Sequence, residues 1–145
     1  MTLGARLTRT TNLAVPSFSL TAVSFTSAQW DTDACFSAGQ PTRLTCRTSG
    51  NYLVQGSVQF AANANGPRDL GIRLNGQTFV VSQRNASVGP SATADLNVTA
   101  TCRLNVDDYV ELLLQHYATP SGTTLNILAA DDFSPRFAMV RIAPL

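Results

Sequence analysis

The residues of this chain best suited to chemistry are aspartates that occur in close pairs. The pairs are Asp31 with Asp33, Asp107 with Asp108, and Asp131 with Asp132. Paired carboxylates can act as general acid and base on a sugar, and carboxylates from loops that meet can bind calcium. Each pair lies beside a turn, however, where aspartate commonly caps backbone amides. We therefore expect turn capping and no cofactor, and the candidates for a metal site are Asp31, Asp33, Asp131 and Asp132.

An enzyme would need groups that this sequence does not supply. The one histidine, His116, lies in a run of strand-forming residues, and all ten basic residues are arginine. Without lysine there is neither a phosphate-loop lysine nor a Schiff-base residue. No serine has the G-x-S-x-G surroundings of a nucleophile elbow. We expect His116 to be structural and the protein to have no enzymatic activity.

Three cysteines occur, at positions 35, 46 and 102, without the C-x-x-C spacing of metal or redox sites. Free cysteine behaves as a small apolar residue and is usually buried. The sequence favours three buried free thiols, and it leaves open a bridge between Cys46 and Cys102.

Charge and hydropathy exclude several partners and locations. Only 13% of the residues are charged and the net charge is +1, so no long-range field gathers nucleic acid or an anionic membrane. No segment approaches the roughly 18 apolar residues that span a bilayer. The N-terminal residues lack the apolar core of a signal peptide. We expect synthesis in a cytoplasm, with neither nucleic acid nor a membrane as partner.

Alternation of apolar and polar residues predicts strands along most of the chain. It is clear in Ser17–Phe25, in 53–60 and in Leu70–Leu74, which ends at Asn75-Gly76, a strong hairpin signal. Further alternating runs are 79–81, 96–100, 125–127 and 138–142. Residues 107–118 are ambiguous, because capping acids precede good helix formers. Helix propensity is a weak guide, and since the neighbouring segments are strands we predict a strand there too.

Turn signals at short intervals complete the pattern of a sandwich or jelly roll. We predict an all-β, compact jelly-roll β-sandwich of about eight to ten antiparallel strands spanning residues 12–145. Residues 1–11 lack strong patterning and are predicted to form an N-terminal arm.

Three segments carry a resemblance to a known superfamily. Gly50-Asn51-Tyr52 matches a glycine-x-tyrosine turn into a central strand, Asp108 and Val110 match an aspartate-x-valine step, and Phe133 to Phe137 approximates a closing segment. Together they resemble the jelly roll of the complement globular-head and tumour necrosis factor-like proteins, over about residues 12 to 143. Asp107 stands where that pattern has glycine, and aspartate tolerates the left-handed backbone such a turn requires.

The resemblance implies a homotrimer whose threefold axis is lined by apolar side chains of one sheet. The trimer-interface candidates are Tyr109, Leu113, Tyr117, Phe137 and Met139, and the alternative for each is the core of the single chain. With 44% hydrophobic residues, some apolar surface is expected to remain for protein contacts.

A finer resemblance, in residues 12–36 and in Arg43-Leu44-Thr45-Cys46, is to small virion proteins of tailed bacteriophages. It implies a non-enzymatic structural protein that decorates or cements the capsid surface, with the major capsid protein as a partner. Arg6 and Arg9 of the arm are the candidate capsid anchors, and the alternative for them is a disordered, solvated terminus. The alternatives are a host-recognition tip of a tail fibre or spike, which binds a surface glycan or protein, and a bacterial surface adhesin. The lack of a coiled-coil or collagen-like stalk favours decoration over a fibre tip.

Overall fold

Strands form almost the whole structure. The computed structural model describes residues 1–63, 65–86 and 89–145, and within them it contains twelve strands and no helix. The strands are β1 (Gly4–Thr8), β2 (Leu13–Pro16), β3 (Thr21–Ala22), β4 (Ser27–Asp31), β5 (Arg43–Thr45), β6 (Gly50–Phe60), β7 (Arg68–Leu74), β8 (Thr78–Asn85), β9 (Ala94–Leu104), β10 (Tyr109–His116), β11 (Thr124–Ile127) and β12 (Arg136–Ala143). A helix able to cross a membrane is likewise not found in these ranges.

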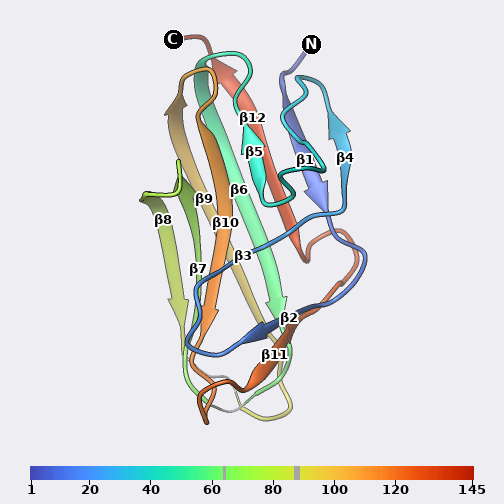
Figure 1. Cartoon of the computed structure of the whole chain (residues 1–145), viewed down its shortest axis with the longest axis vertical. Coiled ribbons are helices and arrows are strands. Elements are labelled where there is room, and N and C mark those ends of the chain that lie inside the picture. The colour runs from blue at the N-terminus through green and yellow to red at the C-terminus, as the bar shows by residue number, and fades with distance from the viewer. Residues whose placement is uncertain (64, 87–88) are drawn as a thin grey trace.

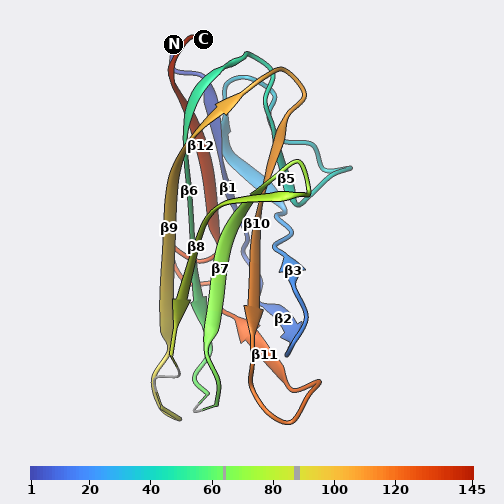
Figure 2. The same cartoon turned by 90° about the vertical axis from the view of Figure 1, so that its left-hand side faces the viewer.

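Two antiparallel sheets pack face to face (Figures 1 and 2). The seven-stranded sheet has the order β2-β11-β6-β12-β1-β4, and β9 pairs with the other edge of β6. The five-stranded sheet has the order β3-β10-β7-β8, and β5 pairs with β10 beside β3. Figure 2 shows β9, β6 and β12 on one side of the molecule and β10, β3 and β5 on the other. The all-β jelly-roll sandwich predicted from the sequence is confirmed, and the count exceeds the predicted one because several strands are only two to five residues long.

The core lies between the sheets and follows the two-residue period of the long strands. On β6 the side chains of Tyr52, Val54, Val58 and Phe60 are at most 1% exposed. They face the equally buried side chains of β10, namely Val110, Leu112 and Leu114. The segment 107–118, which could have been helix or strand by sequence, therefore contains a strand, β10. Its alternate residues form one apolar row that packs against the apolar row of β6.

Two turns form as their residue types predict. Asn75 and Gly76 have φ angles of 52° and 68°, the left-handed pair of a type I′ turn, and join β7 to β8 in a hairpin. Asp107, with a φ of 73°, turns the chain between β9 and β10. Aspartate thus holds the left-handed position that the family pattern gives to glycine.

The segment Ser17–Phe25 was predicted to be one strand, and this is wrong. Only Thr21–Ala22 pairs as a strand, and Phe18 has a left-handed φ of 59°. Phe18 and Leu20 are each 48% exposed, whereas Val23 and Phe25 are buried in the core. The segment runs irregularly along the free edge of β10, held by hydrogen bonds such as that from Val23 N to Leu112 O, 2.9 Å.

The predicted N-terminal arm also needs correction. Gly4–Thr8 forms β1, which lies between β12 and β4 within the seven-stranded sheet. Ala5 and Leu7 are fully buried. The sandwich therefore begins at about residue 4, and removal of residues 1–11 would take a strand from its interior.

The left-handed backbone at Asp107 generates a stability prediction. Asp107→Val should lower the free energy of unfolding by about 1–2 kcal/mol, because a β-branched side chain is strained at positive φ. Asp107→Gly should stay within about 1 kcal/mol of the wild type, since it relieves the backbone and loses only the exposed ion pair to Arg47. Urea unfolding of the three proteins measures this, and equal stability of the valine and glycine variants would contradict the role of the turn.

Candidate functional site

One aspartate in each of two pairs, Asp31 and Asp108, caps backbone amides of a turn. Asp31 accepts hydrogen bonds from the backbone amides of Cys35 and Phe36, both at 2.9 Å, and from that of Asp33 at 3.3 Å. Its carboxylate therefore closes the loop after β4. Asp33 accepts a hydrogen bond from the hydroxyl of Thr48 at 3.3 Å.

The other two pairs show the same pattern of local bonding or exposure. Asp108 accepts from Asn105 N at 2.7 Å and from the side-chain amide of Asn75 at 2.9 Å, which ties the β9–β10 turn to the β7–β8 turn. Asp131 and Asp132 are exposed in the loop before β12. Within the described ranges, no three His, Cys, Asp or Glu side chains come together as metal ligands would.

His116 is enclosed at the end of β10 and is only 1% exposed. Its Nε2 lies 2.8 Å from Val15 O, so this nitrogen donates the hydrogen bond, and Nδ1 accepts from Ala118 N at 3.4 Å. Burial lowers the pKa of the imidazole, and the nearby Arg68 guanidinium lowers it further. The neutral ring with both nitrogens bonded to backbone has a structural role.

The cysteines are three buried free thiols. Burial raises the pKa of Cys35 to about 12, and the carboxylates of Asp31 and Asp33 add to this effect. Burial also raises the pKa values of Cys46 and Cys102. Such thiols are poor nucleophiles, because the thiolate is the reactive form.

The residues predicted for a trimer interface are divided between two regions. Phe137 and Met139 are fully buried in the core of the single chain, so their side chains are not available to another subunit. Tyr109, Leu113 and Tyr117 lie on the outer face of the five-stranded sheet. Leu113 is 2% exposed there, and the two tyrosines are partly buried.

The predicted capsid anchors belong to ordered structure. Arg6 lies within β1 and donates to Asp132 O at 3.1 Å. Arg9 donates to Ser24 O and Thr11 O, each at 2.9 Å, and so holds the start of the β1–β2 connection against the loop before β4. Only Arg6 lies on an outward sheet face.

The outward face of the seven-stranded sheet is a surface that sequence reasoning missed. Because Val54 and Met139 point inward as register partners, the neighbouring pair Leu53 and Val140 points outward. On the same row, Leu53 pairs with Thr101 of β9, and Val140 pairs with Gly4 of β1.

The next row of this face continues the uncharged surface. Gln55 pairs with Ala138 of β12 and with Thr99 of β9. Ile142, 55% exposed, lies at its upper end, in a shallow hollow shared with Asn51 and Thr101. We call this surface the A-face, defined by Leu53, Gln55, Thr99, Thr101, Ala138, Val140 and Ile142.

Arginines surround the A-face without entering its centre. Arg6 and Arg136 lie on β1 and β12 beside Ala138, and Arg103 lies along β9. Trp30 of β4 pairs with Arg6 and is 37% exposed. The centre of the A-face mixes aliphatic and uncharged polar side chains, and depletion of charge together with nearby arginine and aromatic residues is typical of protein–protein interfaces.

Comparison with known proteins confirms the architecture. Solved structures superpose over nearly the whole chain: the globular domain of zebrafish complement 1qA has a TM-score of 0.67 at 14% identity and covers 99% of both chains. Eiger TNF from S. frugiperda has a TM-score of 0.72 at 13% identity, covering 99% of this chain and 94% of its own. Murine APRIL has a TM-score of 0.72 at 12% identity, covering 98% and 100%.

The fold is the C1q and tumour necrosis factor jelly roll. At these identities the likeness establishes the fold alone. No family model matches the sequence, and no curated protein is similar to it. The three structures are of zebrafish, S. frugiperda and murine proteins, so they lend no support to a bacteriophage virion.

The burial of His116 generates a prediction on pH. Its folded-state pKa is lowered, so the unfolded chain binds the additional proton first and acid favours unfolding. The free energy of unfolding should be steady above about pH 7 and fall by up to about 2 kcal/mol by pH 5. His116→Gln should remove this slope, because it is the only histidine. An equal slope in both proteins, from urea unfolding at pH 5 to 7.5, would contradict it.

Proposed function

We propose that the chain is a non-enzymatic structural protein that assembles as a homotrimer through its A-face. The observation that carries this proposal is the uncharged centre of that face. Leu53 is 39% exposed and Ile142 is 55% exposed on a sheet whose other face is already fully packed. Exposed apolar groups on a flat sheet favour burial against another protein, because their removal from water is stabilising.

A closed arrangement of three copies agrees with the shape of this face and with the sequence resemblance. Copies around one axis would bury the A-face and leave both loop-bearing ends and the five-stranded sheets outward. Closed point-group symmetry also prevents continued growth into fibres. Arg6 and Arg136 at the margin would lie near the edge of such a contact, where solvated charges favour one register over others.

At the finer level we propose that the trimer decorates the capsid of a tailed bacteriophage. Support comes from the sequence resemblance in residues 12–36 and 43–46, and from an assembly that needs no catalytic site. Arg6 is the better placed anchor candidate, because it donates to one backbone carbonyl of its own chain, Asp132 O, whereas Arg9 donates to three. A trimer that binds only the mature shell stabilises it by mass action.

Light scattering tests the assembly. The wild type should have the mass of three 15.4 kDa chains, about 46 kDa. Leu53→Asp should weaken association by about 100-fold and give a monomer at micromolar concentration, because it places a charge in the centre of the interface. Val106→Asp is the matched control, since Val106 is 54% exposed in the β9–β10 turn.

The control should retain the trimer mass, and both variants should keep the wild-type circular dichroism spectrum. A wild-type protein that is monomeric at 100 µM, a concentration about 100-fold above that used to compare the variants, would refute self-assembly. A Leu53→Asp protein that remains trimeric would assign the interface to another surface.

Co-sedimentation tests the virion role. Purified trimer should pellet with empty capsids of a tailed phage whose genome encodes this sequence, with saturation at a fixed number of copies per shell. Arg6→Glu, once light scattering shows that it is still a trimer, should reduce that binding. Arg47→Glu should leave it unchanged, because Arg47 is exposed beside Asp107, away from the A-face. Binding to host cells without binding to capsids would instead support receptor recognition.

A further inference from the structure

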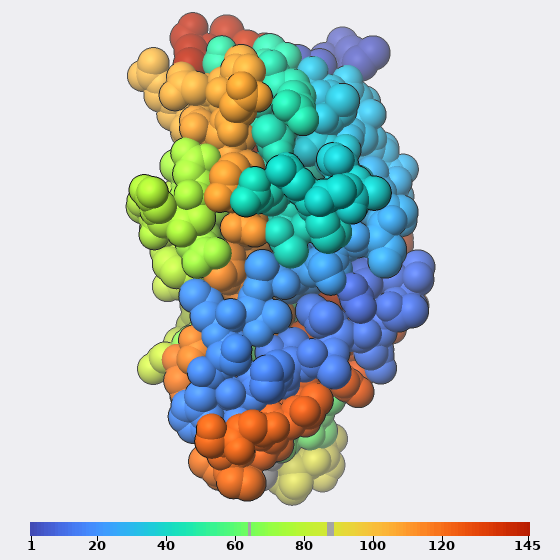
Figure 3. Space-filling view, viewed as in Figure 1, coloured from blue at the N-terminus to red at the C-terminus, as the bar shows by residue number. Residues whose placement is uncertain are grey.

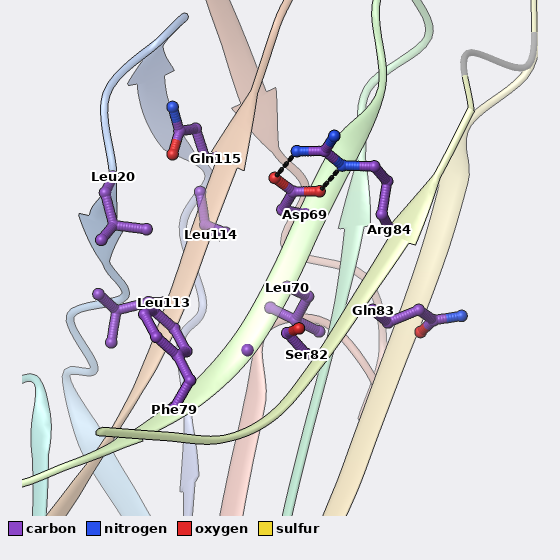
Figure 4. A pocket seen from close by; sticks show the side chains of 11 residues that line it. Leu20, Asp69, Leu70, Phe79, Ser82, Gln83, Arg84, Leu113, Leu114 and Gln115 are labelled. Atoms are coloured by element: carbon purple, nitrogen blue, oxygen red, sulfur yellow. Dashed lines mark hydrogen bonds and ion pairs between the residues drawn. The ribbon is translucent and has the colours of Figure 1, made fainter. Parts of the chain in front are cut away.

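A pocket lies on the outer face of the five-stranded sheet, on the side of the sandwich opposite the A-face. Its volume is about 460 Å³, within the range of ligand pockets. Figure 4 shows side chains from β7, β8, β10 and the segment before β3 around it, and Figure 3 shows this side of the molecule with β10 between the β7–β8 hairpin and the 17–25 segment. The residues that line it are Leu20, Asp69, Leu70, Gly71, Phe79, Ser82, Gln83, Arg84, Leu113, Leu114 and Gln115.

One end of the pocket is apolar. Leu20 and Phe79 are its walls, at 48% and 44% exposed, and Leu113 lies between them at 2% exposed. Gly71 permits this arrangement, because a Cβ at this position would lie 2.9 Å from Cδ1 of Phe79. The missing side chain lets the aromatic ring lie low on the sheet beside Leu113, so an apolar surface faces outward instead of being packed away.

The other end carries an ion pair whose cation is the more exposed partner. Arg84 donates from Nε and Nη2 to the two carboxylate oxygens of Asp69 at 2.7 and 2.8 Å. The Tyr117 hydroxyl donates to the same carboxylate at 3.0 Å. These bonds hold the pKa of Asp69 below its usual range, so the carboxylate stays ionised. The side chain of Arg84 is 61% exposed and that of Asp69 only 26%.

The row beyond the apolar end repeats this arrangement. Arg73 Nη2 lies 3.5 Å from Glu111 Oε1, and the exposed fractions of the two side chains are 24% and 9%. Glu111 also accepts a hydrogen bond from the Thr42 hydroxyl at 2.6 Å. Arg43 lies over the Tyr109 ring at 3.9 Å. In both rows the carboxylate lies beneath its arginine. Arg84 projects into solvent at one end of the pocket, whereas Arg73 is largely covered, so the exposed cation beside the apolar end is Arg84.

We propose that this pocket binds an acidic peptide segment of a partner protein, with an apolar side chain between Leu20 and Phe79 and a carboxylate at Arg84. Arg84 supplies the charge for this occupant: Asp69 takes its Nε and Nη2, and Nη1 of the exposed guanidinium is left to donate to a carboxylate of the peptide. Ser82 and Gln115 at the rim offer hydrogen bonds to a peptide backbone. Because the walls are half-exposed, the pocket is open along the sheet and accommodates a segment of chain passing across it.

This inference does not depend on the trimer or on the virion role. The pocket is formed by one chain and lies on the face away from the A-face. Failure of self-assembly appears in the mass of the protein, whereas failure of this proposal appears only in peptide binding.

Fluorescence anisotropy tests the proposal with defined probes. The probe is a fluorescein-labelled heptapeptide that has one leucine flanked by two glutamates and is otherwise serine and glycine. It should bind saturably below about 1 mM, an affinity suited to a small contact. Two control peptides replace the glutamates by lysines or the leucine by serine, and each should bind at least about tenfold more weakly. Raising the salt concentration from 0.05 to 0.5 M should weaken binding of the glutamate peptide. The Debye length becomes about threefold shorter, so the attraction between the peptide carboxylates and Arg84 is screened.

Two variants assign the binding to this pocket. Leu20→Ser removes an exposed apolar wall of the pocket. Arg84→Gln removes the cation, while the Tyr117 hydroxyl still donates to Asp69. Each substitution should weaken peptide binding about five- to tenfold. Val106→Ser and Arg103→Gln make the same chemical changes on other exposed surfaces and should leave binding unchanged.

A measurement on the wild type guards against misfolded variants. Titration of ¹⁵N-labelled protein with the glutamate peptide should shift the amide signals of Gly71, Ser82 and Leu113 most strongly. The proposal is overturned if the lysine peptide binds as well as the glutamate peptide, or if the amide shifts cluster on another surface. It is also overturned if no peptide binds at 1 mM, which corresponds to a binding free energy weaker than about 4 kcal/mol.

Discussion

The close approach of the two sheets at Gly56 is the constraint on which the rest of the structure depends. Gly56 is on the inward face of β6, and a Cβ there would collide with the side chain of Leu112 on β10. Leu112 is fully buried in the space that the glycine leaves. Because packed interiors have few voids, this contact fixes the position along the strands at which β6 packs against β10 of the other sheet. With β6 placed, its pairings with β9 and β12 decide which side chains face outward on the seven-stranded sheet.

The parts of the fold that the sequence predicts are those where one face is apolar and the other polar. The inward residues Val110, Leu112 and Leu114 of β10 were recognised by alternation, and the Asn75-Gly76 turn by its backbone requirement. For β12 the sequence left open whether Phe137 and Met139 face a trimer interface or the core, and they lie in the core. The two faces of β12, Phe137 with Met139 and Ala138 with Val140, are both apolar, so alternation does not say which faces the core. Only the register with β6 decides it.

The missed strand β1 and the misassigned segment before β3 have a different cause. β1 has the sequence Gly-Ala-Arg-Leu-Thr, in which small residues hide the alternation, and its partners lie at the far end of the chain, over residues 136–140. A pairing so distant in sequence leaves no local signal. Before β3 the apolar residues Phe18 and Leu20 alternate without being buried, because they line a surface. Before β3, unlike in β1, the failure of local patterning therefore coincides with exposed apolar groups.

The two outward faces of the sandwich differ in a way that assigns them different partners. The A-face has no ion pair across its central rows, so identical copies can meet there without burying a charge, which is costly unless the charge is paired. The opposite face carries the ion pairs Arg84 with Asp69 and Arg73 with Glu111, so a second copy meeting this face would have to cover paired charges. Self-association is therefore easier on the A-face. Under the peptide-binding proposal the occupant of the opposite face brings a carboxylate to Arg84, so assembly and partner binding would use separate surfaces of one chain of 145 residues.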